Sequence, residues 1–534
     1  MINLRTKTRV VMMGILLFSM VTTFAIAQSS DPAPNRTEGE GPYERLIIRG
    51  ANMIDGTGAP MSGPVDIVIE GNKIASVHRV GYPGVPINEA RRPKGATQEL
   101  DATGMYIMPG FIDMHVHTGG AHKVPSAEYT YKLWMGHGVT TVRGVSFDQS
   151  NIFEWSISEK ERSAKNEITA PRMFSYHRMG TGWDKPVTTP EEAREWVRFA
   201  KKQGIDGLKL GAEDPLIMEA VLDEAKKLKL NSTAHLGQTG VVRMNTADAT
   251  KLGLGAQTHY YGLFESMYDS NDIQPYPIDY NYQDEQWRFG QVARQWNLVT
   301  PRGEKWNALI DLFLEHDLTM DPTMTIYEAG RDVMRARNAD FQQEYTLPQM
   351  WDYYTPSRTA HGSYWFDWTT EDEVQWKKFY QVWMQFLNDY KNAGGRVTTG
   401  SDSGFIYNLY GFGYIRELEL LQEAGFHPLE VIRSATMNGA EELYKRLDEE
   451  PPFGIIRPGK LADLVIVEEN PLHNLKVLYG TGAVKVTDDN EVVRVGGVKY
   501  TIKDGIVYDA KQLLKDVRDM VDEQEAKVGK KKQY

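Results

Sequence analysis

The stretch "PGFIDMHVHTGG", residues Pro109–Gly120, carries two histidines one residue apart at the end of an apolar run and then stops at two glycines. Alternate side chains of a β-strand point to the same face, so a strand over residues 107–117 predicts that His115 and His117 lie side by side. Two imidazoles at one strand end can bind a metal ion, or they can form a hydrogen-bonded pair beside a loop. This stretch alone leaves both interpretations open.

The composition is that of an ordinary globular protein that is long enough for one large and one smaller domain: 534 residues, 41% hydrophobic and 25% charged. Acidic residues exceed basic ones, 72 against 60, and no basic patch is present, so we expect no nucleic acid partner. The chain has no cysteine, which excludes disulfides, a cysteine nucleophile and thiolate ligands. Any metal must therefore be held by histidine, carboxylate or modified lysine.

The first residues have the pattern of a secretory signal peptide over residues 1–27. Arg5, Lys7 and Arg9 precede an apolar run, and "AIA" at Ala25–Ala27 has the small residues of a cleavage site. The alternative is an uncleaved membrane anchor, but the run is short for a membrane span. We expect an exported protein, periplasmic or extracellular, with no stable membrane anchor after cleavage.

The rest of the chain predicts an α/β fold in which a TIM (β/α)8 barrel carries a small β-sandwich domain built from N- and C-terminal segments. Strands alternate with helical stretches in the central part, whereas both ends consist of short strands separated by turns. The predicted divisions are a linker at 28–44, the sandwich at 45–104 and 455–510, the barrel at 105–454 with aromatic-rich insertions at about 262–316 and 327–392, and a C-terminal helix with a basic tail at 511–534.

Chemically distinctive residues fall at the carboxyl ends of the expected barrel strands, where the active sites of such barrels lie. The expected strand ends are at or near His115, Arg143, Tyr176, Lys209, His235, His259, Thr325 and Asp402.

Four of these positions extend the histidine pair. Lys209 lies in a short strand between two glycines that share its face; near metal ions such a lysine can react with carbon dioxide to give a bridging carbamate, and the alternative is a surface lysine. His235 and His259 each end an apolar or β-branched run, as ligands or as satisfied polar residues. Asp402 stands in the turn "GSDSG", as a ligand or as a turn residue.

Together these features resemble the amidohydrolase superfamily of metal-dependent hydrolases, over about residues 46–509. The motifs are "PGFIDMHVH", "GVTTVRG", the Lys209 strand, the two single-histidine strands, "TTGSDSG" and "GIIRPGKLADLVIVEENPL". The resemblance implies two divalent metal ions, usually zinc. It also implies that His115, His117 and Asp402 bind one ion, that His235 and His259 bind the other, and that carboxylated Lys209 bridges them.

The expected function is hydrolysis by a metal-bridging hydroxide, with Asp402 as the catalytic residue that accepts and passes on a proton. Lys209 favours the two-metal hydrolases over the one-metal deaminases. Among the former the chain looks most like prolidase-like and N-acyl-amino-acid-hydrolysing members, so we expect an exported enzyme that cleaves the amide C–N bond of a small dipeptide-like or N-acyl-amino-acid substrate. The alternatives are a cyclic amide, lactone or phosphoester hydrolase with the same site, and a non-catalytic exported binding protein.

The substrate-binding residues are less clear from the sequence. His177 or Arg178 is a candidate contact for a substrate carboxylate, or a structural residue, and Tyr260 and Tyr261 are further candidates. Eight of the twelve tryptophans lie between residues 287 and 383, where they form either a lid over the pocket or the interior of inserted helices. The C-terminal helix offers a surface for a homo-oligomer, or is a solvated tail.

Overall fold

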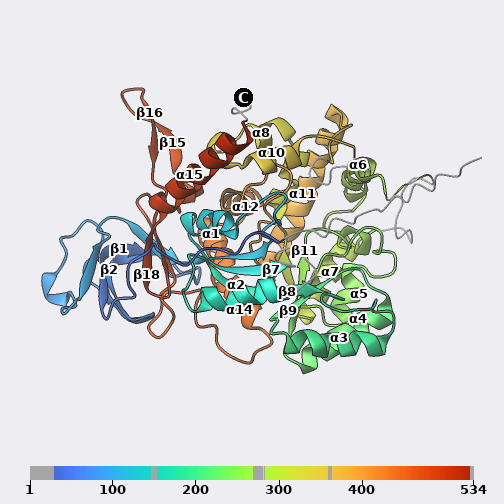
Figure 1. Cartoon of the computed structure of the whole chain (residues 1–534), viewed down its shortest axis with the longest axis horizontal. Coiled ribbons are helices and arrows are strands. Elements are labelled where there is room, and N and C mark those ends of the chain that lie inside the picture. Colours follow the sequence, from blue (N-terminus) through green and yellow to red (C-terminus); the bar gives the residue numbers. More distant parts are fainter. Residues whose placement is uncertain are drawn as a thin grey trace, which may run out of the picture.

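The computed structural model describes residues 29–145, 153–268, 279, 281, 283–358 and 364–529 (Figure 1). The predicted signal peptide and the basic residues after 529 lie outside this part of the chain. Among the described residues, no helix has the length and apolar content that a membrane span requires.

Eight parallel strands form one sheet in which each strand pairs with the next one along the chain. They are β6 (Phe111–Val116), β7 (Val139–Val145), β8 (Arg172–Arg178), β9 (Gly207–Leu210), β10 (Asn231–Ala234), β11 (Ala256–Thr258), β12 (Thr319–Asp321) and β13 (Arg396–Val397). The seam between the first and last strands is bridged just after β13. The N–H of Met114 donates to the Thr399 carbonyl (2.8 Å), and the N–H of Asp402 donates to the His115 carbonyl (2.8 Å). The predicted barrel is confirmed as a TIM-like barrel.

Helices cover the outer face of this sheet, and inward-pointing side chains fill the barrel. The strands are therefore buried on both faces, and every residue of β6, β7, β9 and β10 is buried. Capping residues set where the helices begin: in α3, Thr189 and Glu192 form a capping box beside Pro190. The surrounding helices are α1 (Ala127–Gly136), α2 (Glu154–Ala164), α3 (Pro190–Lys202), α4 (Pro215–Lys227), α5 (Thr246–Lys251), α7 (Glu304–Glu315), α12 (Phe412–Glu423), α13 (Pro428–Ala435) and α14 (Met437–Tyr444).

The seventh strand ends earlier than predicted, at Asp321 rather than near Thr325. Pro322 follows Asp321 and has no N–H to donate to a strand ladder. Thr323 then adopts a left-handed backbone conformation (φ 50°), and Thr325 lies in the 3-10 helix η3 (Met324–Gly330). The residue that the barrel presents at this strand end is therefore an aspartate.

Strands from both ends of the chain pair in a second sheet, in the order β18-β17-β14-β5-β1-β2-β3, with β4 on β1. They are β1 (Leu46–Met53), β2 (Ser62–Glu70), β3 (Lys73–Arg79), β4 (Gln98–Asp101), β5 (Tyr106–Pro109), β14 (Leu464–Val467), β17 (Val498–Lys503) and β18 (Ile506–Asp509). Apolar side chains from several of these strands, such as Ile48 on β1, Ile67 on β2 and Ile466 on β14, pack in one apolar core. The strand pairing joins both segments into one sheet rather than two separate ones.

The remaining elements lie outside the two sheets. They are the hairpin β15 (Ala483–Val486) and β16 (Val492–Val495), the helices α6 (Glu285–Trp296), α8 (Val333–Arg337), α9 (Gln342–Tyr345), α10 (Pro348–Tyr354), α11 (Thr370–Asn392) and α15 (Ala510–Val528), and the 3-10 helices η1 (Glu89–Arg91), η2 (Phe264–Ser266) and η5 (Leu475–Leu478). In the inserted helices Trp296, Trp376 and Trp383 are completely buried, and the rings of Phe379 and Trp383 stack 5.5 Å apart. These tryptophans form the interior of the insertion.

Candidate metal centre

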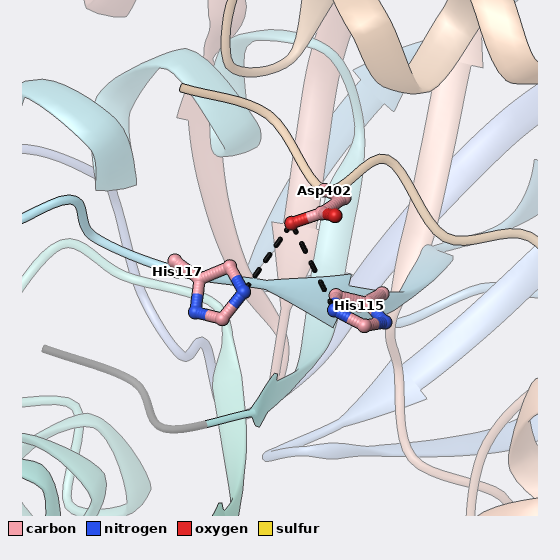
Figure 2. Close-up of side chains that lie close together, drawn as sticks. All are labelled: His115, His117 and Asp402. Carbon is pink, nitrogen blue, oxygen red and sulfur yellow. Dashed lines mark ion pairs between the residues drawn. The ribbon is translucent and has the colours of Figure 1, made fainter. Parts of the chain in front are cut away.

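His115 and His117 at the end of β6 meet Asp402, which follows β13 (Figure 2). Nε2 of His117 lies 3.3 Å from Oδ1 of Asp402, and Nε2 of His115 lies 3.8 Å from the same oxygen. One ligand atom from each residue can be chosen so that all three lie within 4.8 Å of one another. Two imidazole nitrogens and a carboxylate oxygen at this spacing fit one divalent ion such as zinc.

The other predicted ligands surround the same carboxylate. Nε2 of His259 lies 3.6 Å from Oδ2 of Asp402, and the His235 and His259 rings are 4.8 Å apart between centroids. Nζ of Lys209 lies 3.2 Å from Nε2 of His115. The structure thus brings all six predicted ligands together, each from the end of the expected strand.

Burial sets the protonation state of these groups. It lowers the pKa of His115, of His259 and of Lys209 well below the ordinary values. For Lys209 the charge of Asp402 opposes this shift, whereas the positive charges of Arg178 and Arg143 add to it. Neutral imidazole is the form that binds metal, and a neutral amine is the form that reacts with carbon dioxide.

Strained backbone directs two of the ligands into the site. Asp402 (φ 47°) and His259 (φ 64°) are non-glycine residues in the left-handed region. Backbone hydrogen bonds hold them: the N–H of Asp402 donates to the His115 carbonyl, and the N–H of His259 donates to the Asp321 carbonyl (3.1 Å). Nδ1 of His259 is also hydrogen-bonded to the Thr323 hydroxyl. Such strain is typical of functional sites.

Asp113 connects the strand that carries His115 and His117 to the turn that carries Asp402. Its carboxylate accepts hydrogen bonds from the Ser401 N–H (2.8 Å), the Ser401 hydroxyl (2.6 Å) and the His115 N–H (3.2 Å). Burial raises the pKa of Asp113 to about 8. The sequence analysis missed this residue, although its place inside "PGFIDMHVH" was a signal.

Arg178 and His177 end β8 with opposite orientations. His177 is 1% exposed, is hydrogen-bonded to the Ser175 hydroxyl (2.9 Å) and packs against Phe153 (4.7 Å between ring centroids). Arg178 is exposed and lines a cavity of about 220 Å³ together with Lys209 and His235. Of the two, Arg178 faces the site.

The neighbouring tyrosines also differ. Tyr261 lies 4.5 Å from the His235 ring between centroids, and its hydroxyl accepts a hydrogen bond from Tyr327 (3.0 Å). Tyr260 is fully buried against the inserted helices, with Phe379 at 5.1 Å and Trp383 at 5.4 Å. Tyr261 therefore borders the site, and Tyr260 belongs to the interior of the insertion.

Lys123 is a buried cation beside the Asp402 turn that the sequence analysis missed. Its Nζ donates to the Gly404 carbonyl (3.1 Å) and lies 3.7 Å from the Phe405 ring centroid and 4.4 Å from that of Tyr353. Burial lowers the pKa of Lys123 to about 7, against the opposing charge of Asp402. It lies in an irregular segment after the ligand strand, where no periodic pattern marks a position as functional.

Comparison with known proteins gives partial sequence matches. A family model described as "Amidohydrolase family" matches residues 382–507. An adenine deaminase of Lactiplantibacillus plantarum is 31% identical over 101 residues, which is 17% of this chain and 18% of the relative. An N-acyl-D-aspartate deacylase of Alcaligenes xylosoxydans xylosoxydans is 34% identical over 98 residues, 18% and 16% of the two chains. A dihydroorotase of Elusimicrobium minutum is 27% identical over 233 residues, 39% and 46%. The chain spans less than half the length of each of these relatives.

Solved structures match over most of the chain. A Xaa-Pro dipeptidase with bound methionine in the active site has a TM-score of 0.55 at 19% identity, over 87% of this chain and 100% of that one. A putative prolidase from Bifidobacterium longum has 0.55 at 20%, over 89% and 99%, and an A. niger ochratoxinase has 0.56 at 17%, over 87% and 96%. At these identities the likeness shows the fold.

Fold and site together define a TIM-like barrel protein with a candidate metal centre at the carboxyl ends of its strands. Residues 382–507 match the family model of the amidohydrolases, and the chain as a whole shares the fold of the solved structures named above.

Proposed function

We propose that this protein is an exported, metal-dependent hydrolase that cleaves the amide C–N bond of a small dipeptide-like or N-acyl-amino-acid substrate. The observation that carries the proposal is the convergence of four histidines, Lys209 and Asp402 on one buried point. A site that only binds a ligand has no need of so many ligating groups on strained backbone.

The donor set fits two divalent ions, which we propose to be zinc. His115, His117 and Asp402 would hold one ion and His235 and His259 the other, with carboxylated Lys209 between them. When bound, such ions lower the pKa of a shared water and polarise the scissile carbonyl.

Asp402 would move the proton. Its carboxylate lies within 3.3–3.8 Å of Nε2 of three of the histidines, and at 8% exposed it is more accessible than His115 or His117. The carboxylate accepts a proton from the attacking water and then gives it to the leaving nitrogen, so that the C–N bond breaks with the amine as a neutral product.

Arg178 would bind the carboxylate of the substrate. It lines the same cavity as Lys209 and His235, so a substrate carboxylate paired with its guanidinium lies beside the reacting bond. A cavity of about 220 Å³ suits a small substrate. The similar fold of a Xaa-Pro dipeptidase and the partial match to an N-acyl-D-aspartate deacylase support this substrate class.

A cyclic amide is the second candidate substrate. The match to a dihydroorotase extends over 39% of this chain, the longest of the three reported sequence matches. The same water and the same proton transfer open a ring amide, so the choice between the two substrate classes depends on the contacts of the cavity.

The test is metal content by elemental analysis on protein purified without chelator, followed by assay of dipeptides, N-acyl-amino acids and cyclic amides. We expect near two ions per chain and hydrolysis of an acyclic amide that carries a carboxylate. One ion or none, or exclusive turnover of ring amides, would contradict the proposal. Sequencing of the mature N-terminus tests export, with a new N-terminus at Gln28 expected.

A further inference from the structure

Arg143 and Asp321 form an ion pair in the barrel interior beneath the ligands. They lie on the second and seventh strands, β7 and β12, with Nη2 of the arginine 2.8 Å from Oδ2 of the aspartate. Both side chains are completely buried. Arg143 is the arginine of "GVTTVRG", a motif to which the proposed mechanism gives no role.

The guanidinium of Arg143 contacts two of the strands that carry the histidines. Its Nε donates to the carbonyl of Met114, the residue before His115 (2.6 Å). Its Nη2 also lies 3.4 Å from the hydroxyl of Thr233 on β10, two residues before His235. That hydroxyl is hydrogen-bonded to Thr258, the residue before His259 (2.6 Å). One buried cation thus links the backbone and side chains that precede three ligands.

Asp321 approaches His115 from the other side. Its Oδ2 lies 3.8 Å from Nδ1 of His115, and within the described part of the chain that nitrogen has no hydrogen-bond partner. A carboxylate behind the second nitrogen of a ligating histidine fixes the tautomer and the ring orientation. Here the charge of Asp321 favours the tautomer of His115 that carries its proton on Nδ1. The lone pair of Nε2, on the side of Asp402, is then available for a metal ion.

We propose that Arg143 and Asp321 act as a positioning pair that holds His115 in its ligating orientation and thereby sets the affinity for metal; this rests on the proposed function. Arg143 neutralises the buried carboxylate and holds the Met114 carbonyl, while Asp321 aligns the imidazole. Neither residue touches the substrate.

The test compares two changes that each replace a buried carboxylate in the barrel by the corresponding amide. Asp321→Asn removes the charge behind His115. Glu442→Gln makes the matched change at a completely buried carboxylate that accepts hydrogen bonds from Asn231 and Thr319, at the start of β10 and β12. Zinc affinity of the apo-protein is measured by competition with a chromophoric chelator, with folding monitored by circular dichroism.

We expect Asp321→Asn to weaken zinc binding about 10- to 100-fold, and Glu442→Gln to leave it unchanged. Equal affinity in wild type and Asp321→Asn overturns the positioning role. If Asp321→Asn does not fold, Arg143→Lys replaces it: the charge remains, but the contact with Met114 is lost, and an intermediate weakening is expected, with unchanged affinity overturning the proposal. Failure of the wild type itself to bind zinc contradicts the proposed function instead.

A second, independent feature is the β15–β16 hairpin, which projects from the body of the molecule (upper left of Figure 1). Within the described residues these strands pair with each other alone, so both outer edges are open. Val486 lies opposite Val492 and Val484 opposite Arg494, which puts the three valines on one face. They are 61%, 72% and 56% exposed, in the same order. An open, apolar hairpin is a surface that pairs with another chain.

The charges of the hairpin complement themselves when two copies run in opposite directions. The tip is acidic, with Asp488, Asp489 and Glu491, and the strands carry Lys485 and Arg494, of which Arg494 also pairs with Asp340 of its own chain. An antiparallel pair brings each acidic tip next to the basic strands of the other copy. We infer that the partner of this hairpin is a second copy of the chain, which packs valine face against valine face around a two-fold axis.

The absence of cysteine makes this directly testable. Val492→Cys places one thiol on the hairpin face, and Val85→Cys places one on a valine that is comparably exposed elsewhere (57%). With a short bis-maleimide we expect covalent dimers of Val492→Cys and monomers of Val85→Cys. By sedimentation we expect a dimeric mass for the wild type and a monomeric mass for the Val484→Thr/Val486→Thr/Val492→Thr variant. A monomeric wild type, or an unchanged mass of the triple variant, overturns the inference.

Discussion

The carboxylate of Asp113 accepts two hydrogen bonds from Ser401, one from the backbone N–H and one from the hydroxyl, across the seam of the barrel. It also accepts the N–H of His115. The Asp113 side chain therefore adds to the backbone hydrogen bonds that fix the strand with the two histidines to the turn with Asp402.

Asp113→Ala removes the two oxygens that accept these three hydrogen bonds and leaves buried donors without partners. We expect a loss of about 1–3 kcal/mol in the free energy of unfolding, measured by urea denaturation. We also expect weaker zinc binding, because His115 and Asp402 lose their common support. Asp311→Ala, at an exposed position on α7, is the control and should change neither quantity.

Asp402→Asn tests proton transfer. The amide keeps the size of the side chain but cannot accept the proton, so we expect turnover to fall at least 100-fold while binding of a substrate analogue changes little. Steady-state kinetics and calorimetric titration measure the two effects. Retained turnover would disprove the role assigned to Asp402.

Lys209→Ala tests the bridge between the two metal positions. We expect loss of metal and of activity, with partial rescue by a short carboxylic acid that enters the space of the missing carbamate. Elemental analysis and activity with and without the acid are the measurements. A fully active protein with a full complement of metal would rule out the carbamate.

Arg178 and His177 form a matched pair for substrate recognition. Arg178→Gln removes the cation at the cavity, so KM for substrates with a carboxylate should rise about 10- to 100-fold, as expected for a lost charge-assisted pair. His177→Gln should leave KM unchanged and lower stability, because His177 is packed against Phe153. The reverse result would transfer the substrate-binding role to His177.

His137 predicts a pH dependence of stability. It is buried against Phe412, with Nδ1 2.8 Å from the Leu133 carbonyl, and burial lowers its pKa to about 4. As the pH falls, His137 of the unfolded chain, with a pKa of about 6.5, binds a proton before His137 of the folded chain does. The contribution of neutral, buried His137 to stability is therefore complete above pH 6.5 and is lost as the pH falls toward 4. The maximum loss is about 3 kcal/mol. Urea denaturation of His137→Gln should show a shallower decline over this range; an identical decline would refute the assignment.

The sequence by itself predicted which residues form the candidate metal centre. A two-residue period predicts that His115 and His117 share a face, and the alternation of strands and helices predicts that Lys209, His235, His259 and Asp402 reach one end of a barrel. These patterns are local in the sequence. Because a parallel barrel places the carboxyl ends of all its strands at one face, the prediction does not require the side-chain contacts.

Only the tertiary structure decided which neighbours face the site. Arg178 points to the cavity and His177 into the packing, and Tyr261 borders His235 whereas Tyr260 does not. Adjacent residues point in different directions, and at these strand ends the direction depends on ladder register and on strained backbone such as that of His259 (φ 64°). The pairing of Arg143 with Asp321 joins residues 178 positions apart, and only barrel closure brings them together.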